Sequence, residues 1–443
     1  MAKSVTVKQD QLPVKRTLLN KLTSLKDRVI ADDVARDSAI MTAFTLLAGL
    51  FNYLYQLSMG IMLTPVEYGA LLSFFSLFTI ISLFSQAVQT ATTKFTSKLK
   101  AQHQTGGIRY LWGFSLKRML WASVGLFIVG ALLTPLISSF LKIDNYWYSL
   151  LFSTSLILVF AVPVNYGLLQ GLQRFLPLGI STTLAGLLKL AIGALLVYLG
   201  LGVYGGLLCL PIALVATLGI TCYYLKDVAA TKTEKVPLSG LFSYTGLAIV
   251  AIASFGIFTN IDVILAKHYL GPESAGNYAV ISVLGRVALF APAGVAIAMF
   301  PKTSDLFETL SNYRPVLRKA ILFTVLLAGG VVVIFWLFPD FIINLLFADK
   351  YPLVVPYLFR YTLAMALFAL SFLFVNYFLS LNRTRVAYPL LGTALVQVVL
   401  IVLFHSNIGH IVNTILLSST ICLTLMLLYY LKVNNDISNN TRI

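Results

Sequence analysis

Four ionisable side chains interrupt long apolar stretches of the sequence: Lys189, Asp262, Arg286 and Arg360. Placing such a group in the middle of a membrane span costs about 2.5–3.5 kcal/mol, so each is a candidate functional residue. Three bases against one acid leave an excess of positive charge, which suits an anion. Guanidinium groups in particular bind phosphate through paired donors. The pattern therefore favours a phosphate or pyrophosphate ligand over a cation.

Uncharged polar side chains follow single faces of the same apolar stretches. Asn52 and Gln56 share one helical face. Gln86 and Gln89 share another. Such stripes are expected to face protein or water rather than lipid. We therefore predict a substrate-binding set that joins these stripes to the four charges: Arg286, Asp262, Asn52, Gln56, Gln86, Gln89, Arg360 and Lys189.

Each of these residues also has a purely structural interpretation. Asp262 can pair with Arg286 or Lys267 and hold two spans together. Arg360 can extend its head group to the membrane surface, and Lys189 can bond to a neighbouring helix. The Asn and Gln side chains can link helices for under about 1 kcal/mol each. The sequence leaves these alternatives open.

Catalytic and cofactor chemistry has no matching motif. We find no phosphate-binding glycine loop, no nucleophile paired with a base and no acidic cluster in a loop. His405 and His410 lack a third ligand for a metal, and the three cysteines lie in apolar runs where they act as small hydrophobic residues. We expect a protein that is not an enzyme and that has no cofactor or metal.

The elements that carry these side chains are membrane helices. The chain has 443 residues, of which 58% are hydrophobic and 11% charged, whereas a soluble domain has roughly 25% charged residues. Apolar stretches long enough to cross about 30 Å of hydrocarbon number about twelve. We place them at 38–63, 69–92, 119–141, 146–171, 176–199, 203–225, 241–267, 275–300, 320–338, 353–381, 386–405 and 409–431.

Lys and Arg residues indicate the orientation. With this set of spans, 26 of the 32 basic residues fall on the side of both termini and three on the opposite side. Positively charged loops stay in the cytoplasm, so we expect a multi-pass protein of the cytoplasmic membrane with both termini in the cytoplasm. The net charge of +16 therefore reflects topology, and no nucleic-acid partner is expected.

The two halves of the chain repeat. A shift of 207 residues aligns Pro65 with Pro272 and Gly69 with Gly276. Six spans per half give two lobes in the same orientation around a central cleft, as in transporters. The fold class predicted is thus all-α, with about 12 transmembrane helices in two pseudo-symmetric six-helix lobes. The predicted domains are a basic amphipathic tail (1–37), an N-lobe (38–226), an inter-lobe loop (227–240), a C-lobe (241–431) and a tail (432–443).

Seven short motifs occur in order along the spans: NYLYQ at 52–56, PVEYGA at 65–70, QAVQT at 86–90, LQGLQRF at 169–175, NIDV at 260–263, AGNYA at 275–279 and FPK at 300–302. Together they resemble the O-antigen and capsule branch of the multidrug/oligosaccharidyl-lipid/polysaccharide exporter superfamily, over nearly all of 38–431. The resemblance implies a flippase that moves undecaprenyl-pyrophosphate-linked oligosaccharide by alternating access. It also implies a cleft lined chiefly by spans 1, 2, 7 and 8. Such a cleft disfavours Lys189 on span 5 and favours the residues on those four spans: Asn52, Gln56, Gln86, Gln89, Asp262 and Arg286.

The expected partners are the lipid-linked oligosaccharide, membrane lipids, a coupling ion and other proteins of polysaccharide assembly. Two rival functions remain. A drug or cation antiporter of the same superfamily is disfavoured by the excess of bases. A membrane-bound polymerase or glycosyltransferase is disfavoured by the short outer loops.

Overall fold

The computed structural model describes residues 40–237, 246–308, 314–348, 350–381 and 383–440. Within these ranges every regular element is helical. Ten helical segments are long and apolar enough to cross a membrane. One of them, Phe175–Tyr224, has 50 residues and folds back on itself near Gly200 and Gly202, where φ is +88° and +51°. With the 24-residue helix Gly246–Tyr269, the described residues provide twelve helical crossings of membrane-spanning length, in agreement with the prediction of about twelve.

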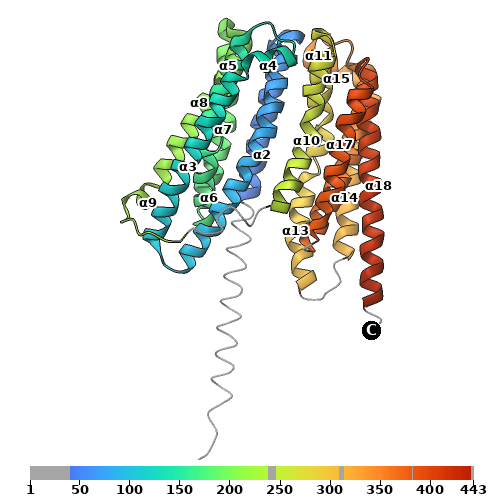
Figure 1. Ribbon diagram of the computed structural model, residues 1–443. Coiled ribbons are helices and arrows are strands. Elements are labelled where there is room, and N and C mark those ends of the chain that lie inside the picture. The colour runs from blue at the N-terminus through green and yellow to red at the C-terminus, as the bar shows by residue number, and fades with distance from the viewer. Residues whose placement is uncertain (1–39, 238–245, 309–313, 349, 382, 441–443) are drawn as a thin grey trace, which may run out of the picture.

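The twelve crossings form two bundles that stand side by side (Figure 1). The N-lobe contains Ile40–Met62, α2 (Pro65–Ala101), α3 (Thr105–Leu132), α4 (Thr134–Phe140), α5 (Tyr146–Ser155), α6 (Ala161–Gly171), α7 (Phe175–Leu196) and α8 (Gly202–Tyr224), followed by α9 (Lys226–Ala230). The C-lobe contains α10 (Gly246–Tyr269), α11 (Pro272–Gly285), α12 (Val287–Phe290), α13 (Ala293–Glu308), α14 (Arg314–Leu337), α15 (Pro339–Phe347), α16 (Val355–Ser380), α17 (Ala387–Leu403) and α18 (Ile408–Asn440). This is the two-lobe, all-α class that the sequence predicts.

Equivalent helices of the two lobes begin in the same way. Thr64 is extended and caps α2 through a capping box with Glu67, and Pro65 is the first helical residue. Gly271 is also extended, and Pro272 opens α11. Proline suits this position because its fixed φ is helical and its missing N–H would have no partner there. The repeat read from the sequence is therefore a repeat of local structure.

Two equivalent glycines bring the lobes together. A Cβ on Gly69 of α2 would lie 2.9 Å from the backbone nitrogen of Gly276 in α11, and a Cβ on Gly276 would lie 1.9 Å from the carbonyl oxygen of Pro65. Only glycine permits an approach this close. The glycine pair thus sits where α2 and α11 cross, at the end of the molecule that the loop charges predict to be outer.

Several predicted boundaries differ from the structure. The helix of the third crossing begins at Thr105 rather than near 119, because its polar first turns are helical too. The last helix continues to Asn440, past the predicted end at 431. The predicted breaks between spans 176–199 and 203–225, and between 386–405 and 409–431, both occur. The basic amphipathic tail predicted at 1–37 lies outside the described residues.

Candidate functional site: buried charges in each lobe

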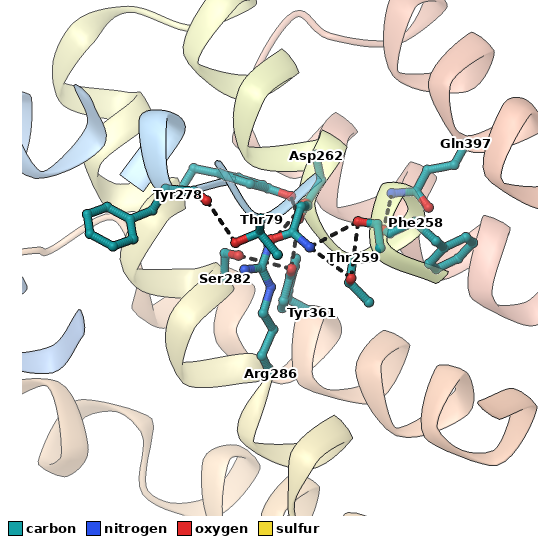
Figure 2. A network of polar contacts seen from close by, with 12 residues as sticks. Thr79, Phe258, Thr259, Asp262, Tyr278, Ser282, Arg286, Tyr361 and Gln397 are labelled. Carbon is teal, nitrogen blue, oxygen red and sulfur yellow. Dashed lines mark hydrogen bonds and ion pairs between the residues drawn. The ribbon is translucent and has the colours of Figure 1, made fainter. Parts of the chain in front are cut away.

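The C-lobe holds a buried polar cluster built from three helices. Asp262 comes from α10, Tyr278 and Ser282 from α11, and Tyr361 from α16, while Arg286 ends α11. Figure 2 shows their side chains pointing toward one another. Every member is at most 7% exposed. The face shared by Tyr278, Ser282 and Arg286, visible as helical spacing in the sequence, is the face that meets Asp262.

Both oxygens of the Asp262 carboxylate have partners. Oδ1 lies 3.2 Å from Nη2 of Arg286. Oδ2 accepts from the Tyr278 hydroxyl at 2.8 Å and from the Tyr361 hydroxyl at 2.7 Å. The Tyr361 hydroxyl is also 3.2 Å from Oγ of Ser282. The carboxylate is therefore held mainly by two short phenolic hydrogen bonds, and the ion pair is a longer, single contact.

Arg286 lies at a break in its span. The helix stops at Gly285, resumes as α12, and stops again before Pro292, after which α13 begins. Broken helices at membrane depth are tolerated where they line a polar site. The Nε of Arg286 is buried and has no hydrogen-bond partner in the described part of the chain. A guanidinium with a spare donor can take a second oxygen ligand beside the one from Asp262.

The N-lobe holds a charge of a different kind. Lys189 of α7 is 9% exposed, and its ammonium donates to Oδ1 of Asn52 in the first span. The same ammonium lies 4.8 Å from the ring centre of Tyr55 and 5.2 Å from that of Phe75 in α2. Among the described residues no acidic side chain forms an ion pair with it. Lys189 is thus a buried cation that is stabilised by an amide and two aromatic faces.

The remaining predicted residues do not join either cluster. Gln89 donates to Oε1 of Gln170 in α6 at 3.1 Å, inside the N-lobe. Arg360 is exposed and approaches Oδ1 of Asn413 in α18 at 3.3 Å. Gln56 is half-buried and Gln86 is exposed. The eight predicted residues therefore separate into a C-lobe pair, an N-lobe pair and four scattered side chains.

Sequence reasoning missed the polar contacts that join the lobes at the predicted outer end. Lys350 of the C-lobe directs its ammonium at the carbonyl oxygens of Ile61, at 2.9 Å, and of Leu63, at the C-terminal end of the first span. The Tyr351 hydroxyl donates to the carbonyl oxygen of Gly60 at 2.8 Å. A cation at a helix C-terminus satisfies carbonyls that lack an intrahelical partner. Burial lowers the pKa of Lys350.

A second contact lies at the same end. The ring of His268 in α10 stacks on Phe140 of α4 with centroids 4.1 Å apart, and its Nδ1 is 2.6 Å from the Phe140 carbonyl oxygen. Between the lobes, α2 packs against both α10 and α11. Each of these contacts joins segments more than 100 residues apart in the chain, so no local signal in the sequence marked them.

Comparison with known proteins agrees with this architecture. A family model described as polysaccharide biosynthesis protein matches residues 34–307, more than half of the chain. The chain belongs to this family. No curated protein matches the chain.

Solved structures of transporters resemble this member of the family. One is a multidrug resistance MATE family transporter of the MOP superfamily in an inward-facing conformation, with a TM-score of 0.78, 15% identity, and coverage of 88% of this chain and 96% of that one. The outward-facing conformation of such a transporter gives a TM-score of 0.63 at 15% identity, with coverage of 89% and 94%. A MOP superfamily transporter from Pyrococcus furiosus gives 0.64 at 16% identity, with coverage of 89% and 94%. At these identities the likeness shows the fold.

The buried ionisable groups described above are an ion pair in the C-lobe and a single cation in the N-lobe. In the described residues no group of three or more His, Cys, Asp or Glu side chains gathers as a metal site would require. The cysteines at 209, 222 and 422 are free. The described helices bury one ion pair, Asp262 with Arg286, and two lysines, Lys189 in α7 and Lys267 near the end of α10. These arrangements suit reversible binding inside a membrane transporter.

Proposed function

We propose that the protein is a flippase that moves lipid-linked oligosaccharide, with an undecaprenyl-pyrophosphate carrier, across the cytoplasmic membrane for cell-surface polysaccharide synthesis. Membership of the polysaccharide biosynthesis family and the two-lobe transporter fold support this class. A sugar-pyrophosphate head group cannot cross hydrocarbon alone, because burying an unpaired charge costs tens of kcal/mol in the Born limit. A polar path between lobes removes that cost while the prenyl chain stays in lipid.

The observation that carries the proposal is the state of Arg286. Its guanidinium is buried in a broken helix, makes one long contact to Asp262 and keeps an unpaired Nε donor. Arginine binds phosphate oxygens through two parallel donors. Arg286 is therefore the residue that we assign to the pyrophosphate, and Asp262 holds it in place between substrates. The half-buried Asn52 and Gln56 and the exposed Gln86 are assigned to sugar hydroxyls.

Alternating access is the transport mode that we assign. All polar contacts described above between the lobes lie at one end, around Lys350, Tyr351 and His268. The opposite ends of the two bundles, where α9 and α13 lie, stand apart in Figure 1. Loop charge assigns that end to the cytoplasm. Rocking of the lobes would break the outer contacts and close the inner end.

A cation or drug antiporter is less well supported by the site. Such a transporter needs an acid that is free to bind its cation, whereas Asp262 already has three partners. The rival enzyme function makes a separate prediction, which is the formation of a sugar bond by the purified protein. Detection of that product would establish the enzyme instead.

The test is head-group translocation in liposomes that contain the purified protein and a lipid-linked oligosaccharide. Access of a membrane-impermeant periodate reagent to the sugar reports its side. We expect Arg286→Ala to slow translocation by about 30-fold, which corresponds to ~2 kcal/mol lost with one charged hydrogen-bonding partner. Arg286→Lys retains the charge but loses the paired donors and should be intermediate. Exposed Lys117 provides a control, since Lys117→Ala should translocate normally. Unchanged translocation in Arg286→Ala would give Arg286 a structural role only.

A further inference from the structure

Lys189 is a buried charge to which the proposed mechanism assigns no role. It lies in α7, two-thirds along a span whose residues 186 and 193 are both glycine. A Cβ on Gly186 would be 3.2 Å from the Ala48 carbonyl oxygen, and a Cβ on Gly193 would be 2.6 Å from the Tyr55 ring. The two glycines therefore press α7 against the first span, one helical turn on either side of Lys189. Lys189 is therefore enclosed by the close packing of α7 against the first span.

The surroundings of the ammonium group allow two charge states. Asn52 Oδ1 accepts a hydrogen bond from Nζ, and it can do so from either a charged or a neutral amine. The faces of Tyr55 and Phe75 favour the charged form through the ring quadrupole. Burial without an acidic partner favours the neutral form. Since these effects oppose each other and no hydrogen-bond partner is lost, the proton can leave or return without disrupting the fold.

Other titratable groups around Lys189 are fixed. On the first span, the Tyr55 hydroxyl donates to the Gly206 carbonyl oxygen at 2.8 Å. On α8, the Cys209 thiol donates to the same carbonyl at 3.0 Å. On α2, the side chain that faces the Lys189 ammonium is the ring of Phe75, which does not titrate. Among the described residues, none of these elements brings a second charge within ion-pairing distance of Lys189. A change of charge in this site is therefore a change at Nζ.

We propose that Lys189 is a proton-binding site, and that the proton it carries is the coupling ion of transport. In one half of the cycle the N–H bond breaks, the electron pair stays on Nζ and the proton passes to water beside half-buried Asn52. In the other half, Nζ takes a proton from water on the outer side. One proton then moves inward for each head group that moves outward. This inference rests on the proposed function for its transport role, while proton binding at Lys189 stands independently of it.

The transport test uses the same liposomes, with the membrane potential clamped and a pH difference of one unit imposed. For one coupled proton, the steady-state distribution of head groups should shift by about tenfold per pH unit. We expect this shift in the parent protein and in the control Lys117→Met. Lys189→Met should translocate down a lipid gradient but show no shift. Lys189→Arg, which keeps its charge at any accessible pH, should also show none. A normal tenfold shift in Lys189→Met would overturn the proposal.

A second measurement separates this inference from the proposed function. The ¹⁵N resonance of the Lys189 amine, assigned by its absence in Lys189→Met, can be followed in nanodiscs from about pH 5 to pH 9. Titration within that range is the expected result. A lysine that stays fully charged throughout overturns proton binding, whether or not the protein is a flippase. Absence of translocation by the parent protein at equal pH would instead overturn the proposed function.

Discussion

The two lobes bury charge in opposite ways. In the C-lobe, Asp262 and Arg286 neutralise each other, and two tyrosine hydroxyls complete the shell of the carboxylate. In the N-lobe, Lys189 has an amide and two aromatic rings but no acidic partner among the described residues. Removing one member of a closed pair leaves a buried charge, whereas removing a lone cation leaves none. The repeated fold therefore holds a closed charge pair in the middle of one lobe and, in the other, a cation whose charge we propose can change.

The largest effect is expected from Asp262→Ala. It leaves the Arg286 guanidinium buried without its carboxylate and the Tyr278 hydroxyl without its acceptor, at a cost of about 3–5 kcal/mol. Thermal unfolding in detergent measures this loss. The double variant Asp262→Ala/Arg286→Leu removes both charges and should recover most of the stability. If the double variant were no more stable than the single one, the unpaired Arg286 charge would not be the cause of the lost stability.

The second effect compares equivalent glycines at the lobe contact. Gly276→Ala would put a methyl group 1.9 Å from the Pro65 carbonyl oxygen, while Gly69→Ala would put one 2.9 Å from the Gly276 nitrogen. Overpacking of this kind costs about 1–3 kcal/mol, and the tighter site should cost more. We expect Gly276→Ala to separate the lobes at the predicted outer end, measured as a wider distance between spin labels there. Gly69→Ala is the matched comparison. Equal widening in both variants would contradict the expectation that the tighter contact at Gly276 has the larger effect.

The third effect is a small one in the N-lobe. Lys189→Met replaces an unneutralised cation with an apolar side chain of similar shape, so stability should change by less than about 1 kcal/mol, in either direction. The apparent unfolding temperature in detergent measures it, beside Arg286→Met, which strands the Asp262 carboxylate and should be clearly destabilising. If Lys189→Met lowered the unfolding temperature as much as Arg286→Met, both buried charges would be equally important for stability, which would contradict the comparison.

The smallest effect concerns an exposed pair at the predicted cytoplasmic end. Arg174 follows α6 and bonds both oxygens of Asp227 in α9. The same hydrogen bonds lower the pKa of the Asp227 carboxyl and raise the pKa of Arg174. The pair therefore stabilises above the ordinary pKa of aspartate and is lost as pH falls below it. Asp227→Asn should cost under about 1 kcal/mol at neutral pH and nothing in acid. A cost that persists in acid would assign Asp227 another role.

The sequence predicted the membrane helices well because hydropathy acts locally. A stretch of about 20 apolar residues must become helical in a bilayer, since its backbone polar groups have no other partners there. Helical periodicity also placed Tyr278 and Ser282 on the face of Arg286. The ends of helices were less predictable: the start of α3 at Thr105 and the extension of α18 to Asn440 involve polar residues that carry no hydropathy signal.

Contacts between distant segments were not predictable in the same way. Tyr361 lies 99 residues from Asp262, and its hydroxyl reaches the carboxylate only because α16 packs against α11. Lys350 lies 287 residues from Leu63, in a loop without periodicity. Arg360, the immediate neighbour of Tyr361, turns away toward Asn413 because successive residues of a helix point about 100° apart. The local sequence does not show which of these two neighbours faces Asp262.

By itself, the sequence indicated about twelve membrane helices in two repeated halves, with a few ionisable groups buried among them. These properties follow from composition and from the period of the helix. Only the tertiary structure decided that Asp262 neutralises Arg286 and that Lys189 has no acidic partner among the described residues. The physical reason is that the free energy of a buried charge depends on what lies within a few ångströms of it, and helix packing alone sets those neighbours.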